Sequence, residues 1–171
     1  KENNSRLIHI STDYVFDGNG TRPYLESDSI APIGAYGLTK ANGEKAAQAI
    51  LKELYIVRTA WLYGYNGNNF VYTMLKLMNN KSELSVVNDQ IGSPTFASDL
   101  AYTIIMIILS RGLTEKSLPT AIDYGIYHCT DIAEISWYDF AKAIYKIGKE
   151  KGKINSDCII KSCTTEEYPT K

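Results

Sequence analysis

The sequence has little cysteine and little histidine. Of its 171 residues, three are cysteines (Cys129, Cys158 and Cys163) and two are histidines. An odd number of cysteines without paired spacing is typical of reduced thiols, so we expect no disulfide framework and a cytoplasmic location. His9 and His128 lack a surrounding cluster of further ligand residues, so no metal site is predicted.

An excess of charge of one sign and long apolar runs are also missing. The 18 Lys and Arg residues nearly balance the 19 Asp and Glu residues, which predicts no surface for nucleic acid or an anionic membrane. The longest apolar run, about residues 100–109, is well short of the roughly 20 residues that a spanning helix needs, so we expect a buried helix there. Residues 1–5 are polar, and no signal peptide is expected.

Segments typical of strands and of helices alternate along the chain, which favours a parallel sheet covered by helices and therefore an α/β fold. The predicted strands are residues 6–11, 55–61, 84–88, 125–130 and 158–163. The predicted helices are residues 35–52, 68–79, 96–110 and 136–149, with caps at Asn68 or Asn69, at Ser98 or Asp99, and at Ser136. Residues 13–28 predict a long loop and residues 113–123 a linker.

One predicted helix carries Tyr36 and Lys40, which lie on one face because they are four residues apart. A free phenol, with a pKa near about 10, is a poor acid at neutral pH, and a nearby positive charge lowers that pKa. Thr12 follows strand 6–11, and ligands in parallel sheets bind at the carboxyl ends of strands. We therefore predict that Tyr36 transfers a proton, Thr12 binds a carbonyl oxygen, and Lys40 assists Tyr36 and binds a ribose. The same spacing also occurs in ordinary helices, and Thr12 is also compatible with a simple turn residue.

Five motifs extend this pattern in a fixed order. They are Ser11–Gly18 (STDYVFDG), Tyr36–Lys40 (YGLTK), Arg58–Trp61 (RTAW), Gly67–Phe70 (GNNF) and Asn88–Thr95 (NDQIGSPT). Together they resemble the dTDP-4-dehydrorhamnose reductase family of extended short-chain dehydrogenases, from about residue 6 to the end of the chain. The resemblance implies the second half of a Rossmann-like parallel sheet, with the catalytic residues, over about residues 1–65. It implies mixed core and a small substrate-binding lobe over about 66–171.

The implied activity is reduction of dTDP-4-dehydro-6-deoxy-L-mannose to dTDP-L-rhamnose with NADPH or NADH. The family's catalytic positions match Thr12, Tyr36 and Lys40. Implied cofactor contacts are Tyr36, Lys40, Ser11, Thr59 and Ala60, and implied substrate contacts are Thr12, Tyr14, Trp61, Asn69, Phe70, Gln90 and Pro94. Three of these assignments have an equal structural alternative. Trp61 also fits a core aromatic, Asn69 with Phe70 fits simple helix capping, and Tyr14 fits packing under the loop.

The sequence departs from the family at its start. No G-x-x-G-x-x-G turn follows a strand, and Gly18 and Gly20 lead into Thr21-Arg22-Pro23 instead of a helix. We therefore expect a portion of a longer enzyme that lacks the glycine-rich cofactor region and is inactive by itself. The residues that distinguish NADH from NADPH are expected to lie outside the chain.

Two other functions stay open: another sugar-nucleotide epimerase or dehydratase, and a non-catalytic regulatory subunit with this fold. The resemblance is compatible with a homodimer, and the sequence carries no sign of whether Mg²⁺ is required.

Overall fold

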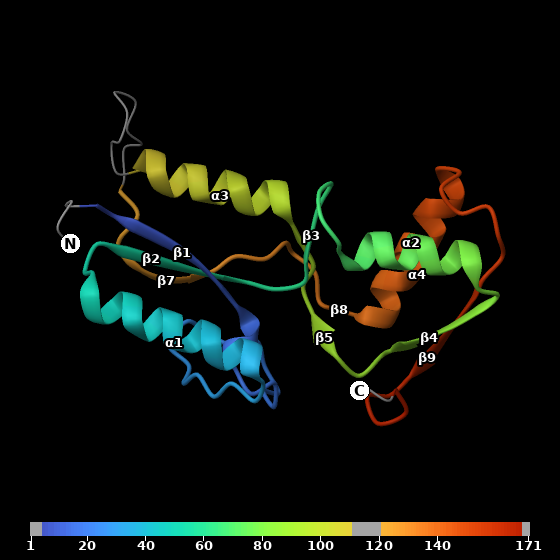
Figure 1. Cartoon of the computed structure of the whole chain (residues 1–171), viewed down its shortest axis with the longest axis horizontal. Coiled ribbons are helices and arrows are strands. Elements are labelled where there is room, and N and C mark those ends of the chain that lie inside the picture. The colour runs from blue at the N-terminus through green and yellow to red at the C-terminus, as the bar shows by residue number, and fades with distance from the viewer. Residues whose placement is uncertain (1–4, 111–120, 169–171) are drawn as a thin grey trace. The chain divides into compact units, whose positions relative to one another are not determined.

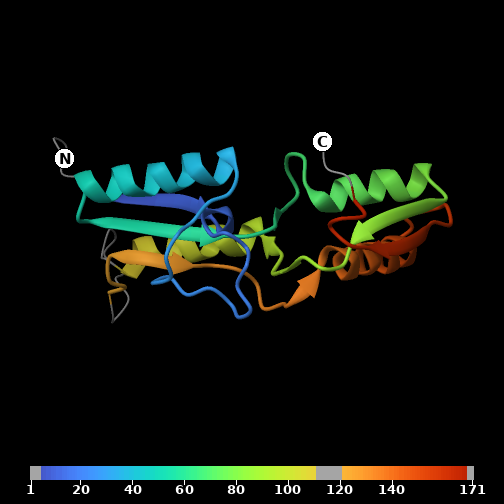
Figure 2. The ribbon, with the colours of Figure 1, turned by 90° about the horizontal axis from the view of Figure 1, so that it is seen from below.

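The computed structural model describes residues 5–110 and 121–168, and the chain divides into two compact units. The first unit comprises the described residues of Lys1–Ala60 and Ser98–Thr130, and the second those of Trp61–Ala97 and Asp131–Lys171. Figures 1 and 2 draw both units from two directions.

The first unit is a three-stranded parallel sheet between helices. Its strands lie in the order β1 (Leu7–Thr12), β2 (Leu54–Thr59) and β7 (Gly125–His128). Every residue of the central strand β2 is buried, as expected for a strand covered on both faces. The helices α1 (Ala35–Ile50) and α3 (Ala97–Ser110) cover opposite faces of this sheet (Figures 1 and 2).

Side chains of β2 alternate between the two helices. Tyr55 and Val57 pack in one core cluster with Leu100 and Ile107 of α3, whereas Arg58 reaches α1. Since successive residues of a strand point to opposite faces, a single strand contributes both to an apolar core and to a buried polar contact. A short 3₁₀ helix, η1 (Asp13–Val15), follows β1 directly.

The second unit packs two helices against a small parallel sheet. The helices are α2 (Phe70–Asn80) and α4 (Trp137–Glu150), and the sheet pairs β4 (Glu83–Val87) with β9 (Ile159–Cys163). Met78, Ala141 and Ile154 are among the most buried residues of the shared core. Two minor pairs complete the unit: β3 (Leu62–Tyr63) with β6 (Thr95–Phe96), and β5 (Ile91–Gly92) with β8 (Ile135–Ser136).

The expected α/β fold with parallel strands is confirmed, and so are two of the expected caps. Asn69 accepts a hydrogen bond from the Tyr72 amide, and Ser136 forms a capping box with Asp139. Within the described ranges, no helix combines the length and apolar character that crossing a bilayer requires.

The structure corrects several expected details. The strand predicted over 55–61 ends at Thr59, because Trp61 adopts a φ of +46°, which an extended strand does not allow. The strands near residues 84–88 and 158–163 pair with each other in the second unit instead of extending the sheet of the first. The four two-residue strands were not predicted, because so short a segment has no periodicity. Most of the predicted linker 113–123 lies outside the described residues.

Candidate active site

Two threonines end neighbouring strands of the first unit. Thr12 and Thr59 are register partners at the carboxyl ends of β1 and β2. The Thr12 hydroxyl donates to the Asp13 carboxylate at 3.0 Å and accepts from the Tyr14 amide at 3.3 Å, so it caps η1. The Thr59 hydroxyl is buried and has no hydrogen-bond partner. An unpaired buried hydroxyl is costly, so this edge of the sheet holds an unused polar group that fits a bound ligand.

The start of α1 packs tightly against η1. A Cβ atom added to Gly37 would lie 2.1 Å from the Tyr14 carbonyl oxygen, so only glycine allows this approach. The contact brings the Tyr36 ring edge-on to the Tyr14 ring, with centroids 5.8 Å apart. Both tyrosine residues are 58% exposed, so Tyr36 is accessible to a ligand.

Lys40 lies one turn beyond Tyr36 on the same helix face. Its ammonium donates a 2.6 Å hydrogen bond to the backbone oxygen of Ile10, two residues before Thr12. The structure therefore anchors Lys40 at the end of β1, while Tyr14 connects Thr12 to Tyr36 through one hydrogen bond and one ring contact. These contacts gather the predicted catalytic residues around η1.

A buried ion pair that sequence reasoning missed lies one further turn along α1. Glu44 accepts two hydrogen bonds from Arg58, at 3.0 and 2.7 Å, and a third from the Ser11 hydroxyl. Burial raises the pKa of Glu44, but the hydrogen bonds from Arg58 and Ser11 lower it more, so its pKa lies below the ordinary value. The sequence did contain a signal for this pair. Glu44 lies two turns after Tyr36 on the same helix face as Gly37 and Ala41, the face that is buried, so a buried partner of opposite charge was to be expected.

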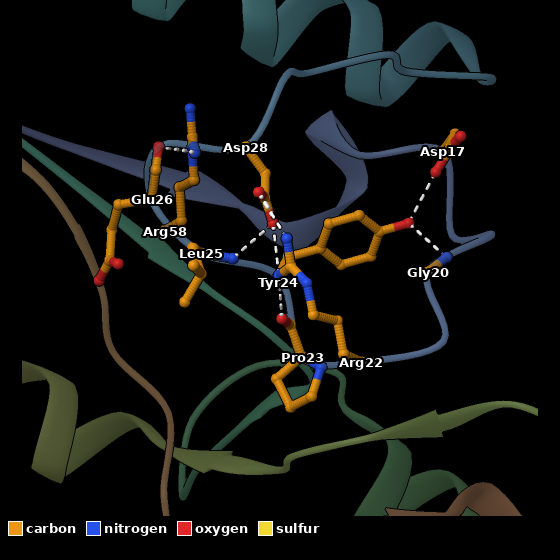
Figure 3. A network of polar contacts seen from close by, with 9 residues as sticks. All are labelled: Asp17, Gly20, Arg22, Pro23, Tyr24, Leu25, Glu26, Asp28 and Arg58. Atoms are coloured by element: carbon orange, nitrogen blue, oxygen red, sulfur yellow. Dashed lines mark hydrogen bonds and ion pairs between the residues drawn. The ribbon is translucent and has the colours of Figure 1, made fainter.

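The long loop after β1 is held by its own polar contacts, which Figure 3 shows. The Tyr24 hydroxyl donates to Asp17 at 2.6 Å, and the Arg22 guanidinium binds both carboxylate oxygens of Asp28 at 2.9 Å. Tyr24 also stacks on Phe16, with centroids 4.3 Å apart. The predicted loop is therefore an ordered surface beside the strand ends.

In the second unit, Trp61 is part of an aromatic cluster. Its ring stacks on Trp137 with centroids 3.6 Å apart, and Phe70 packs on the same Trp137 ring at 4.5 Å. A Cβ atom on Gly92 would come within 2.6 Å of the Trp61 indole, so β5 closes over one part of this ring. The left-handed backbone of Trp61 is a conformation that residues with a side chain rarely adopt, and such residues cluster at functional sites.

The other predicted residues of the second unit make local contacts. Asn69 caps α2 and also donates to the Gly64 carbonyl at 2.9 Å. Gln90 donates to the Thr165 hydroxyl at 3.1 Å, and Pro94 is buried just before β6. The predicted site residues therefore form two sets. The first unit holds Ser11, Thr12, Tyr14, Tyr36, Lys40, Thr59 and Ala60, and the second holds Trp61, Asn69, Phe70, Gln90 and Pro94.

Across residues 5–110 and 121–168, no three or more His, Cys, Asp or Glu side chains come together as a metal site. The parallel sheet between helices, with hydroxyl groups at its strand ends and a Tyr–Lys pair on the following helix, defines a Rossmann-like α/β protein. Comparison with known proteins makes this assignment specific. The chain belongs to the RmlD substrate binding domain family, whose model matches residues 1–171.

Curated relatives share a large part of this sequence. The chain is 42% identical over 168 residues to a dTDP-4-dehydrorhamnose reductase of Aggregatibacter actinomycetemcomitans, covering 98% of this chain and 55% of the relative. It is 46% identical over 167 residues to the spore coat polysaccharide biosynthesis protein SpsK of Bacillus subtilis, covering 98% and 53%. The chain thus spans about half the length of the curated relatives it matches.

A solved structure supports the same family. The dTDP-4-dehydrorhamnose reductase of Bacillus anthracis, in complex with NADP, matches with a TM-score of 0.80 and 40% identity. The match covers 95% of this chain and 52% of that one. The expected resemblance to this reductase family is therefore confirmed.

Proposed function

We propose that the complete protein reduces the C4 ketone of dTDP-4-dehydro-6-deoxy-L-mannose, with NADPH or NADH, to give dTDP-L-rhamnose. The observation that carries this proposal is the packing of Gly37 against Tyr14, which sets the exposed Tyr36 phenol beside the end of β1. The names of the similar reductases supply the substrate and reaction.

The residues at the strand ends fit a nicotinamide cofactor. Thr59 presents a buried hydroxyl that lacks a partner, and Lys40 presents an ammonium at the end of β1. With Tyr36, Ser11 and Ala60, these residues would hold the cofactor along the carboxyl ends of the strands, where parallel sheets bind such ligands. When bound, the reduced nicotinamide supplies the hydride.

The chain's own residues manage the proton and the charge. As the ketone is reduced, its oxygen becomes negative and needs a proton, which the Tyr36 phenol donates. The Thr12 hydroxyl orients this oxygen, exchanging its hydrogen bond with Asp13 for one with the substrate. Lys40 stabilises the negative charge left on Tyr36, because an ammonium close to a phenolate favours the charged form.

The second unit is assigned to the nucleotide sugar. Trp61 offers an aromatic ring on which a hexose packs. Tyr14, on η1, is proposed separately as a substrate contact. Asn69 and Phe70 begin α2, whose backbone amides suit a pyrophosphate. Gln90 and Pro94 belong to the segment that covers the nucleotide. A cytoplasmic location and a homodimer accompany this proposal.

The test is turnover by the complete protein with the dTDP-4-keto sugar and NADPH. NADPH consumption is followed by absorbance, and the product is identified by NMR as dTDP-L-rhamnose. Leu38→Ala, at an exposed position on α1, serves as the matched control and keeps turnover. Conversion of the sugar without net NADPH consumption would instead favour an epimerase or a dehydratase. An absence of any conversion would favour a regulatory subunit.

A further inference from the structure

Lys40 and Glu44 lie one turn apart on the face of α1 that meets the sheet. Oppositely charged residues at this spacing are neighbours on the helix surface and attract each other, although Lys before Glu is the weaker of the two orders. Here they bind different partners. The Lys40 ammonium donates to the Ile10 carbonyl, whereas both carboxylate oxygens of Glu44 accept from Arg58 and one also accepts from Ser11.

The two charges occupy one neighbourhood. His9 of β1 packs against α1: a Cβ atom added to Gly43 would lie 3.6 Å from the His9 ring, which is ordinary van der Waals contact. Burial lowers the pKa of His9, the charge of Lys40 lowers it further, and the charge of Glu44 raises it. Lys40 and Glu44 are four residues apart on α1 and therefore neighbours on one helix face, so a Glu44 carboxylate without Arg58 is an alternative partner for the ammonium.

Other contacts hold the Arg58 side chain in position to pair with the Glu44 carboxylate. Its guanidinium lies 5.1 Å from the centroid of the Phe16 ring. It also donates to the Glu26 backbone oxygen at 3.4 Å, a contact drawn in Figure 3. Its side chain is 4% exposed and that of Glu44 is 1% exposed. A planar guanidinium binds a carboxylate through two parallel hydrogen bonds, which fixes the orientation of both groups.

We propose that Arg58 is a positioning residue that holds the Glu44 carboxylate away from Lys40 and so keeps the Lys40 ammonium at the end of β1 for Tyr36 and the cofactor. Glu44 itself takes no part in the reaction. The proposal deepens the function given above and rests on it for the role of Lys40. It makes a specific prediction: the two halves of one ion pair affect activity unequally.

The test uses Arg58→Gln, Glu44→Gln and the double variant in the complete protein. In Arg58→Gln, the Lys40 ammonium turns to the unpaired Glu44 carboxylate. The kcat per folded enzyme then falls at least about 10-fold, because small displacements of catalytic groups lower the rate by this much or more. In Glu44→Gln no carboxylate competes, so kcat stays within about threefold of wild type, and the double variant recovers a similar value. KM for the sugar changes little in all three, because none of these side chains binds the sugar.

A purely structural ion pair gives a different pattern. It would change kcat per folded enzyme equally in the two single variants, and such symmetry would overturn the proposal. If Arg58→Gln does not fold, the double variant decides, because it buries no unpaired charge: a kcat loss of at least about 10-fold there refutes the proposal. The double variant Arg6→Gln/Glu53→Gln is the matched control. It removes another ion pair, formed by the residues directly before β1 and β2, and should leave kcat unchanged.

A crystal structure separates this proposal from the proposed function. If the wild-type protein does not reduce the keto sugar, the proposed function fails. The positioning role is then judged from the Arg58→Gln structure, or from Arg58→Lys if that variant does not fold. Loss of the Lys40–Ile10 hydrogen bond in favour of Glu44 in Arg58→Gln supports it, and retention of that bond overturns it. In Arg58→Lys the retained positive charge keeps Glu44 occupied, so retention supports the proposal and loss overturns it.

Discussion

Gly37→Ala is the sharpest test of how the fold builds the site. The added Cβ atom would lie 2.1 Å from the Tyr14 carbonyl oxygen and 3.1 Å from the Cβ atom of Pro32. Real Cβ atoms essentially never approach another atom closer than 3.0 Å, so α1 and η1 must separate by at least 0.9 Å. The obstacle is backbone, so no side-chain rotation relieves it.

The expected result has two parts. Overpacking of this kind costs roughly 1–3 kcal/mol of unfolding free energy, against which alanine gains about 1 kcal/mol of helix propensity over glycine. The protein should therefore stay folded with a modestly lower melting temperature. Because a displacement of about 1 Å in a catalytic group can cost about 10²-fold, kcat should fall by one to two orders of magnitude.

Thermal unfolding and steady-state kinetics on the complete protein measure both effects. Gly43→Ala is the matched control, since it is the same substitution in the same helix, and its Cβ atom would lie at an ordinary 3.6 Å from His9. It should stabilise the protein by about 0.5–1 kcal/mol and leave kcat unchanged. A Gly37→Ala enzyme with wild-type stability and wild-type kcat would refute the contact between α1 and η1.

Four further predictions address the site. Tyr36→Phe keeps the ring that meets Tyr14 and should lower turnover about 10²–10⁴-fold, so a wild-type rate would remove its role as the acid. Trp61→Ala should weaken nucleotide-sugar binding, measured by calorimetry, and leave NADPH binding nearly intact. If the substitution instead unfolds much of the protein while the remaining folded molecules bind the sugar normally, Trp61 is a packing residue. The chain of 171 residues by itself should not bind NADPH tightly, because it lacks a glycine-rich turn for the pyrophosphate, and micromolar affinity in a titration would contradict this. Folding lowers the pKa of Glu44, so the stabilising effect of its carboxylate is present above pH 4.5 and is lost as the pH falls through the folded pKa. The difference in unfolding free energy between wild type and Glu44→Gln should therefore shrink in acid. Denaturant unfolding at several pH values measures this difference.

The sequence by itself determined those features that form within a few residues. The helix that carries Tyr36 and Lys40, the caps at Asn69 and Ser136, and the strands before Thr12 and Thr59 all follow from local spacing and local hydrogen bonds. The ordered motifs also indicated the reductase family, which the comparisons confirmed.

Only the tertiary structure decided which distant residues meet. Glu44 pairs with Arg58 across 14 residues and with Ser11 across 33, and the close contact of Gly37 with Tyr14 joins a helix to the loop before it. The pairing of β4 with β9 likewise brings together segments that are far apart in the chain. Periodicity describes which side of an element is buried but not what it is buried against, because the partner depends on how all the elements pack together.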